Sequence, residues 1–285
     1  MHSELLNWFY QNKRNLPWRR GRTPYRVWVS EIMLQQTQVN TVIPYYKKWI
    51  KKYPTLKSFK ESNFDDVIKI WEGLGYYSRC HNMFNAAKLI NSTFPNNYND
   101  LINLPGIGDY TAKTILAIAF KKNFVGIDTN LERIGYRILG LKTKTKRNKK
   151  RVVEYLEKNQ CANNPGDYNE ALMDLGSSLC KASITYCNQC PLKKICKAYT
   201  SSSPILYPTP KVPKKIPIYD IAVSVVEYQN KILITKRQNK NFLPGLWEFP
   251  GGKIEKKETA TQAIIREVKE ETNLTVSNPI FLGNI

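Results

Sequence analysis

Long apolar runs are absent from this chain of 285 residues. None approaches the roughly 20 residues that a bilayer-spanning helix requires, so we expect no membrane partner. The first ten residues form a short amphipathic segment with a charge inside it, which is unlike a secretory signal peptide. Acidic residues are also scarce: 23 Asp and Glu stand against 44 Lys and Arg, a formal net charge of +21. Such an excess predicts an anionic partner, most commonly nucleic acid, although a merely solvated basic surface is the alternative.

Cysteine is rare, and four of the six Cys residues are bunched together. This distribution favours a reducing compartment with a metal site over a disulfide framework. The bunched residues are spaced C-x6-C-x2-C-x5-C: Cys180, Cys187, Cys190 and Cys196. Thiolates suit zinc or an iron–sulfur cluster, and ligand softness alone does not decide between these. Cys80 and Cys161 fall outside the spacing and are expected to be small buried residues.

A glycine-containing turn lies between two helix-like segments, which we expect at 98–103 and 111–120. Pro105 should end the first helix, because proline lacks an amide proton and disfavours helical geometry in the residue before it. Gly106 and Gly108 allow a tight turn and leave the backbone open to a ligand. The free amides of the second helix would then form a phosphate site. A plain link between packed helices is an equally good interpretation of these residues alone.

The chain changes character near residue 200. Before it, apolar residues recur at helical spacing, and prolines such as Pro44 and Pro165 are expected to separate the helices. The segment 142–151 holds seven Lys or Arg in ten residues, and we interpret it as a solvated face rather than a specific DNA contact. A Ser/Pro-rich linker is predicted at 200–217. Beyond it, alternating apolar residues with a turn at Gln229-Asn230 predict a small α+β domain. The expected domains are therefore 1–199 and 218–285.

Three motifs together resemble a known family. The glycine turn, the cysteine spacing and an Asp between them are similar to helix-hairpin-helix DNA glycosylases that carry one 4Fe-4S cluster. The stretches 28–39 (WVSEIMLQQTQV) and 73–79 (GLGYYSR) resemble the adenine glycosylases of the MutY type. The resemblance implies a mainly α helix-hairpin-helix glycosylase fold, with the four cysteines holding the cluster in a structural and DNA-docking role. It implies base excision repair of double-stranded DNA containing adenine opposite 8-oxoguanine or guanine, by a monomer in the bacterial cytoplasm at the nucleoid.

Cleaving a purine N-glycosidic bond requires a proton donor for the leaving base and a carboxylate for the cationic sugar. Glu31 could be only a favourable charge at a helix N-terminus, but the resemblance implies that it protonates adenine and later activates water. Burial would raise its pKa, which suits an acid. Asp128 could be a helix cap, but Thr129 and Glu132 form a capping-box pattern that would leave it free. The resemblance implies that Asp128 stabilises the sugar cation and that Asn130 helps to hold the site.

Tyr110 separates two branches of the family. The bifunctional lyases carry at this position a Lys whose amine forms a Schiff base with the sugar, and tyrosine cannot do so. We therefore expect base removal without efficient strand cleavage, with Tyr110 hydrogen-bonded in the pocket, although an aromatic here could simply be packing. Thr129 replaces the glycine common in MutY and resembles the endonuclease III branch instead.

The resemblance also supplies residues that contact the substrate. Trp18, Arg19 and Glu170 match residues that line the pocket of the flipped adenine, which must leave the base stack to react. Gln36 and Tyr76 match residues that push into the stack beside the lesion. Taken singly, Trp18 and Tyr76 could be core aromatics and Arg19 a surface charge.

The C-terminal segment fits the Nudix box, Gly252-x5-Glu258-x7-Arg266-Glu267-Val268-x-Glu270-Glu271, with Asn273 where glycine is usual. Its last three glutamates share one helix face, which would hold Mg²⁺ against a diphosphate if the domain is active; the alternative is a solvated helix. MutY enzymes carry a Nudix-like domain that reads 8-oxoguanine. Because the segment is short, we expect only a partial Nudix-like domain.

Three alternatives to a monofunctional adenine glycosylase remain open at this point. The first is a bifunctional, endonuclease III-like glycosylase and AP lyase. The second is a Nudix nucleotide hydrolase with a DNA-binding arm. The third, a DNA-binding module without enzymatic activity, is the weakest because it explains neither Glu31 nor Asp128.

Overall fold

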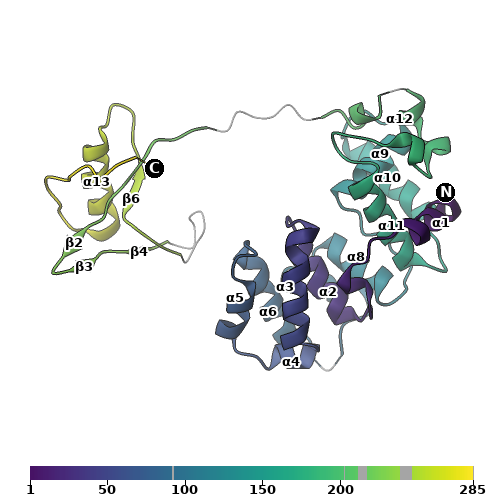
Figure 1. Cartoon of the computed structure of the whole chain (residues 1–285), viewed down its shortest axis with the longest axis horizontal. Helices are drawn as coiled ribbons and strands as arrows, with labels where there is room; N and C mark the ends of the chain where they lie inside the picture. The colour runs from purple at the N-terminus through teal and green to yellow at the C-terminus, as the bar shows by residue number, and fades with distance from the viewer. Residues whose placement is uncertain (92, 202, 211–216, 238–245, 285) are drawn as a thin grey trace. The chain divides into compact units, whose positions relative to one another are not determined.

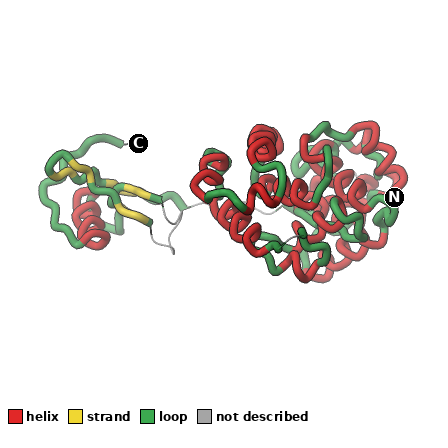
Figure 2. The backbone as a smooth tube through the Cα atoms, turned by 90° about the horizontal axis from the view of Figure 1, so that it is seen from below, coloured by secondary structure: helices red, strands yellow, loops and turns green. Residues whose placement is uncertain are grey.

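A computed structural model of the chain describes residues 1–91, 93–201, 203–210, 217–237 and 246–284. The chain divides into two units, Met1–Lys211 and Val212–Ile285, and each is considered by itself. The division falls inside the range predicted as a linker, part of which (202 and 211–216) lies outside the described residues. The limits of that linker stay a prediction. Figure 2 shows helices throughout the first unit, whereas the yellow strands belong to the second.

The first unit is built from helices joined by short turns. Its α-helices are α1 (His2–Asn12), α2 (Pro24–Leu34), α3 (Val39–Lys52), α4 (Leu56–Lys60), α5 (Phe64–Trp71), α6 (Tyr77–Leu89), α7 (Tyr98–Ile102), α8 (Asp109–Ile118), α9 (Thr129–Leu139), α10 (Lys146–Lys158), α11 (Pro165–Ser178) and α12 (Lys197–Thr200). Four short 3-10 helices are η1 (Pro17–Arg19), η2 (Cys187–Gln189), η3 (Lys193–Ile195) and η4 (Pro204–Leu206). The predicted helical character of residues 1–200 is confirmed.

Proline marks some helix starts but not every helix end. Pro165 is the first residue of α11. An amide at this position would have no acceptor within the helix, so proline costs no hydrogen bond there. Pro44, by contrast, lies inside α3, so the prediction that it ends a helix is wrong. The apolar face of α3 explains this, because Val42, Tyr46 and Trp49 are all buried along one side of the helix. Packing of that face outweighs the lost backbone hydrogen bond.

Two hydrophobic cores hold the first unit together. One is formed by η1 and α2 to α8, with Trp28, Trp49 and Trp71 fully buried at its centre. The other joins α1 to α9, α10 and α11, so that Leu5 and Phe9 near the start of the chain pack with residues more than 100 positions later. Figure 1 shows these groups as the purple-to-blue helices α2 to α6 and the teal helices α9 to α11. Helix α8 packs on both α2 and α11 and thus connects the two.

The second unit is small and mixed. Three antiparallel pairs join β1 (Ile221–Val223) to β6 (Gly251–Lys253), β2 (Glu227–Tyr228) to β3 (Lys231–Ile232), and β4 (Thr235–Lys236) to β5 (Trp247–Glu248). The predicted turn at Gln229-Asn230 is confirmed, since both residues have positive φ, as a tight hairpin turn requires. Helix α13 (Ala260–Thr272) packs on β1 and β6 around a core whose buried members are Ala222, Ala263, Ile264 and Val268. The predicted mainly α first part and small α+β second part are confirmed.

None of the helices in the described part of the chain has the length and the apolar character needed to cross a bilayer.

Candidate active site

The glycine turn joins α7 to α8. Gly106 has φ +79°, and a Cβ there would lie 2.9 Å from Cβ of Asn82, so this position requires glycine. Gly108 has φ −92° and open space around it.

Helix α8 starts at Asp109, two residues earlier than predicted. Gly108 is its N-cap, and the Gly108 carbonyl accepts a hydrogen bond from the amide of Ala112. Helix α7 ends at Ile102, one residue before the predicted end.

Side chains from α2, α8, α9 and α11 line one cavity of about 590 Å³. A volume of this size suits a nucleobase with its sugar. Predicted site residues that line it are Trp18, Arg19, Glu31, Gln36, Tyr110, Asp128, Asn130 and Glu170. Tyr76, Gly106 and Gly108 are not part of its lining. The predicted catalytic and base-binding residues are therefore brought together from positions far apart in the sequence.

Glu31 lies on α2 among apolar neighbours and is only 6% exposed. Burial raises the pKa of its carboxyl to about 7, and the charges of Glu170 and Asp128 act in the same direction. A hydrogen bond with Tyr110 opposes the increase in this pKa. A carboxyl with a pKa near neutrality can both give and take a proton at physiological pH, as a general acid–base requires.

Tyr110 is at the second position of α8 and faces the same cavity. Burial, followed by the charges of Glu31 and Asp128, raises its pKa well above the ordinary value, so the hydroxyl stays protonated. Its hydroxyl also lies 3.9 Å from the sulfur of Met173 on α11. Tyr110 is thus a neutral hydrogen-bond donor placed beside the Glu31 carboxyl.

Asp128 is the N-cap of α9, and the prediction that Thr129 and Glu132 would leave it free is wrong. Its Oδ1 accepts the amides of Asn130 at 2.8 Å and Leu131 at 2.7 Å. The side-chain amide of Asn130 donates to Oδ2 at 2.8 Å. Asp128 takes the cap because its backbone is extended (φ −89°, ψ −175°), as an N-cap needs, whereas Thr129 is already helical. These bonds fix the carboxylate at the cavity wall.

A cluster of ion pairs lies at the cavity, to whose lining it contributes Arg14, Arg19 and Glu170. Sequence reasoning found only two of its members, Arg19 and Glu170. Asp174 pairs with Nη1 of Arg19 at 2.8 Å and with Nη2 of Arg14 at 2.6 Å. Glu170 pairs with Nη2 of Arg22 at 2.5 Å and with Nε of Arg19 at 3.4 Å. Burial raises the pKa of Glu170, and the two arginines oppose this. The partners stand about 150 residues apart, so no local pattern could have revealed them.

Gln36 and Tyr76 share an unusual backbone geometry. Both have positive φ, +56° and +49°, which side-chain-bearing residues rarely adopt. Gln36 lines the cavity, while Tyr76 is 57% exposed. Such strained residues cluster at functional sites, where the surrounding structure holds them in place.

Comparison with known proteins gives a family to this geometry. The family profile described as "HhH-GPD superfamily base excision DNA repair protein" matches residues 29–159, and the NUDIX domain profile matches 218–285. The adenine DNA glycosylase of Buchnera aphidicola from Schizaphis graminum is 39% identical over 254 residues, which cover 86% of this chain and 73% of that protein. That from Arabidopsis thaliana is 35% identical, covering 86% and 46%.

The chain belongs to the adenine DNA glycosylase family. It is therefore a base excision repair enzyme that hydrolyses N-glycosidic bonds, and the predictions of family and enzyme class are confirmed. A thermostable thymine-DNA glycosylase has a similar structure, with TM-score 0.64 and 25% identity over 70% of this chain and 95% of that one. An endonuclease III–DNA complex matches with TM-score 0.59 at 20% identity, over 70% and 94%, and this likeness shows the fold alone.

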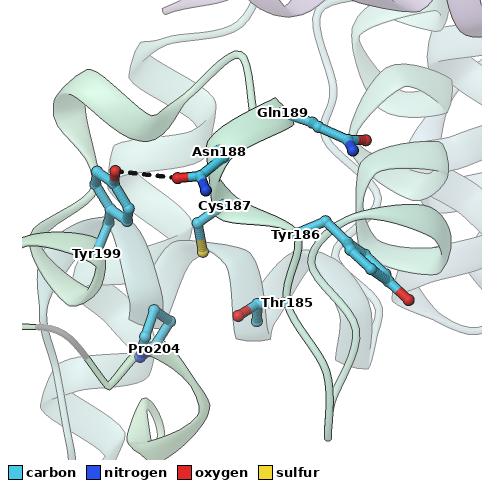
Figure 3. A pocket seen from close by; sticks show the side chains of 7 residues that line it. All are labelled: Thr185, Tyr186, Cys187, Asn188, Gln189, Tyr199 and Pro204. Carbon is cyan, nitrogen blue, oxygen red and sulfur yellow. Dashed lines mark hydrogen bonds between the residues drawn. The ribbon is translucent and has the colours of Figure 1, made fainter.

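The four cysteines expected to hold the family's cluster line one small cavity together with Arg137. Nη1 of Arg137 donates to Sγ of Cys180 at 3.1 Å. Within the described ranges, no three His, Cys, Asp or Glu side chains meet the geometry of a metal-ion site. A neighbouring pocket of about 570 Å³ shares Cys187 and Tyr199 with this cavity, and in Figure 3 the Tyr199 hydroxyl donates to Oδ1 of Asn188 at 3.4 Å.

Three of the Nudix-box glutamates form ion pairs with one arginine. Arg266 pairs with Glu258 at 2.8 Å, Glu267 at 2.8 Å and Glu270 at 3.6 Å. Its hydrogen bonds lower the pKa of Glu258 to about 2. Asn273 takes the left-handed conformation (φ +59°) that ends α13, which explains how it replaces the usual glycine. The glutamates of α13 do not form a metal-ion site among the residues described, so Mg²⁺ finds no support here.

Proposed function

We propose that this chain is a monofunctional glycosylase that removes adenine paired with 8-oxoguanine or guanine in duplex DNA. The observation that carries the proposal is the buried Glu31, whose carboxyl has a pKa of about 7 and shares a cavity with the Asp128 carboxylate. N-glycoside hydrolysis needs one carboxyl group that donates a proton to the leaving base and a second that stabilises the cationic sugar.

The proposed reaction has two steps. Protonated Glu31 gives its proton to the adenine ring, the C1′–N9 bond breaks, and its electron pair leaves with the neutral base. The Asp128 carboxylate stabilises the oxocarbenium ion of the sugar meanwhile. Glu31, now a carboxylate, takes a proton from water as the water oxygen attacks C1′. The products are free adenine and an abasic site, and Glu31 is protonated again.

Neighbouring groups give this chemistry its geometry. Asn130 holds Asp128 through a 2.8 Å hydrogen bond, and Tyr110 keeps the Glu31 carboxyl oriented. Because Tyr110 offers a phenol and no amine, the sugar forms no Schiff base and the strand stays intact. Trp18, Arg19 and Glu170 form the wall that would receive the flipped base.

In this proposal, backbone amides and side chains around the pocket bind the DNA. The amides after Gly106 and Gly108 would bind phosphate at the N-terminus of α8, and Gln36 with Tyr76 would fill the gap left in the stack. We assign double-stranded DNA with A:8-oxoguanine or A:G mispairs as the partner, and a monomer in the bacterial cytoplasm at the nucleoid. The relatives in Buchnera aphidicola support a bacterial setting.

One 4Fe-4S cluster completes the proposal. Cys180, Cys187, Cys190 and Cys196 would hold it, since all four line a single cavity and cysteine thiolates are the usual ligands of such a cluster. When bound, the cluster would order the loop between α11 and α12 for docking on DNA. Arg137 donates to Cys180 and to the backbone of Lys181, and in this way shapes the start of the loop.

The test uses duplexes with adenine opposite 8-oxoguanine, guanine or thymine, each analysed with and without hot alkali. Strand breaks at the adenine only after alkali, and only in the first two duplexes, are expected. Breaks without alkali, together with a borohydride-trapped adduct, would instead identify a bifunctional lyase.

Two further results would redirect the assignment. Absence of alkali-labile sites in every duplex would overturn it. Release of pyrophosphate from 8-oxo-dGTP with Mg²⁺, lost in Glu270→Gln, would identify a Nudix hydrolase.

The same duplexes also test the second unit. Equal rates on the 8-oxoguanine and guanine mispairs would show that the second unit does not read the lesion.

A further inference from the structure

Arg79 on α6 is a buried cation without a carboxylate partner in the described part of the chain. It is 8% exposed, and burial lowers its pKa from the ordinary arginine value. Buried charges are costly unless they are compensated, so the groups that surround this guanidinium need an explanation. Its Nη atoms reach backbone carbonyls and a hydroxyl from two separate segments of the first unit.

The first segment is the end of α2, which carries Glu31. Nη1 donates to the carbonyls of Ile32 at 3.0 Å and Met33 at 2.9 Å, which belong to the two residues after Glu31. The last carbonyls of a helix have no intrahelical partner and form the negative end of its dipole, so they compensate a positive charge. Nη1 also donates to the carbonyl of Gln35, and Nη2 to Oγ1 of Thr37 at 3.1 Å. These two contacts lie on either side of Gln36.

The second segment is the turn that precedes α6. Nη2 donates to the carbonyls of Leu74 at 3.4 Å and Gly75 at 3.1 Å, just before Tyr76. The guanidinium carbon lies 5.2 Å from the centre of the Tyr76 ring and 5.5 Å from that of Trp71. One side chain therefore holds the backbone beside both Gln36 and Tyr76, the two left-handed residues of this region.

We propose that Arg79 is a positioning residue that holds Gln36 and Tyr76 as a pair ready to enter the DNA stack and ties them to the helix of Glu31. The inference rests on the proposed function. Left-handed backbone at two side-chain-bearing residues is unfavourable by itself and persists only where the surroundings impose it. Without the planar guanidinium of Arg79, both segments would leave the left-handed conformation. DNA would then have to order them on binding. Lysine cannot replace that guanidinium, because it is a point charge with a different donor geometry.

The test compares Arg79→Lys with Met83→Ala, a substitution of a core residue one turn later on the same helix. A 2-aminopurine next to the target adenine, in the Glu31→Gln background, reports opening of the stack. Single-turnover rates with Glu31 present are measured on two duplexes: one with adenine opposite 8-oxoguanine, the other with adenine opposite an abasic-site analogue. The second substrate needs less opening, since its adenine has no partner.

For Arg79→Lys we expect loss of most of the fluorescence rise and a rate on the mispair that is about 10- to 100-fold lower. On the abasic-site duplex we expect a loss of less than about threefold. Met83→Ala should show no such difference between the substrates. Thr37→Val removes one hydrogen-bond partner of the guanidinium. It should also lower the rate on the mispair more than the rate on the abasic-site duplex. If Arg79→Lys does not fold, Thr37→Val serves as the test of the positioning role.

Contrary results are clear. Equal rate losses on both duplexes, or a normal fluorescence rise in Arg79→Lys, would overturn the positioning role. Wild-type protein that releases no adenine from either duplex would overturn the proposed function instead. Indifference of an active enzyme to Arg79→Lys and Thr37→Val would overturn only the role of Arg79.

Discussion

Glu31 changes its protonation state within the physiological pH range, since burial raises its pKa to about 7. If it acts as the acid, only the protonated form starts the reaction. The single-turnover rate constant should therefore be level below pH 7 and fall about tenfold per pH unit well above it. Rates measured across pH 5.5 to 9 on an A:8-oxoguanine duplex check this.

The matched variant for this prediction is Glu31→Gln. It should lower the rate by about 10² to 10⁴ and abolish the pH dependence of whatever rate remains. A wild-type rate that increases between pH 7 and 9 would contradict the assignment of Glu31 as the acid.

In the proposed mechanism, Tyr110 takes the place of an amine that would break the strand. Tyr110→Lys places an amine in a buried cavity, where desolvation lowers its pKa and increases the fraction of nucleophilic free base. We expect borohydride to trap a covalent DNA adduct with Tyr110→Lys and none with the wild type. Tyr110→Phe is the control, because it removes the hydroxyl without adding an amine. An adduct with the wild type would show that another amine reaches the sugar.

The hairpin between α7 and α8 offers a paired test at the level of an element. Gly106→Ala should destabilise the protein by about 1–3 kcal/mol, since φ is +79° and the new Cβ meets Asn82. Gly108→Ala should leave stability within about 1 kcal/mol, because its surroundings are open. If backbone amides here bind phosphate, Gly108→Ala should nevertheless weaken DNA binding. Urea unfolding and fluorescence anisotropy separate the two effects.

Asp128 caps α9 and is proposed to stabilise the sugar cation, and substitutions can separate these two roles. Asn is as good an N-cap as Asp, so Asp128→Asn should keep α9 stable while it removes the negative charge on which the proposed role depends. Asp128→Ala loses the cap as well, with a cost of about 1 kcal/mol in the free energy of unfolding. Both variants should lose most of their activity. Full activity in Asp128→Asn would show that capping is the only task of this residue.

Sequence patterns predicted the elements better than the contacts between them. Helical periodicity predicted the helices, because it is a local signal, and the family resemblance supplied the residues that line the cavity. The cap at Asp128 was misread, since a capping-box pattern does not say which residue has the extended backbone. Pro44 was misread as a helix end, because burial of one face of α3 keeps the helix continuous through this proline. Asp174 and Arg79 were missed because their partners come from elements that meet only in the folded chain.

At the scale of the whole molecule, the formal charge of +21 predicts DNA binding that weakens steeply with salt. Each phosphate contact contributes about 0.9 to the slope of log affinity against log salt concentration. Lys194 in the cysteine loop is exposed, and Lys194→Gln should lower that slope by about one. Lys146→Gln at the start of α10 should leave it unchanged if the basic run there is only solvated. Anisotropy titrations at several salt concentrations show whether the cysteine loop or the basic run of α10 contacts phosphate.

The packing of α1 on α11 affects how the enzyme is made. Glu31 leaves the ribosome long before Glu170, which lines the cavity from α11, and Asp174, which pairs with Arg19 of the cavity wall. A nascent chain that has finished α2 to α8 thus holds an acid but neither a pocket for the base nor the cap of α9. Contacts of such long sequence separation form late in folding. If Glu31 is the acid, we therefore expect chains that end before α11 to release no adenine from DNA, because the cavity that would receive the base is incomplete in them.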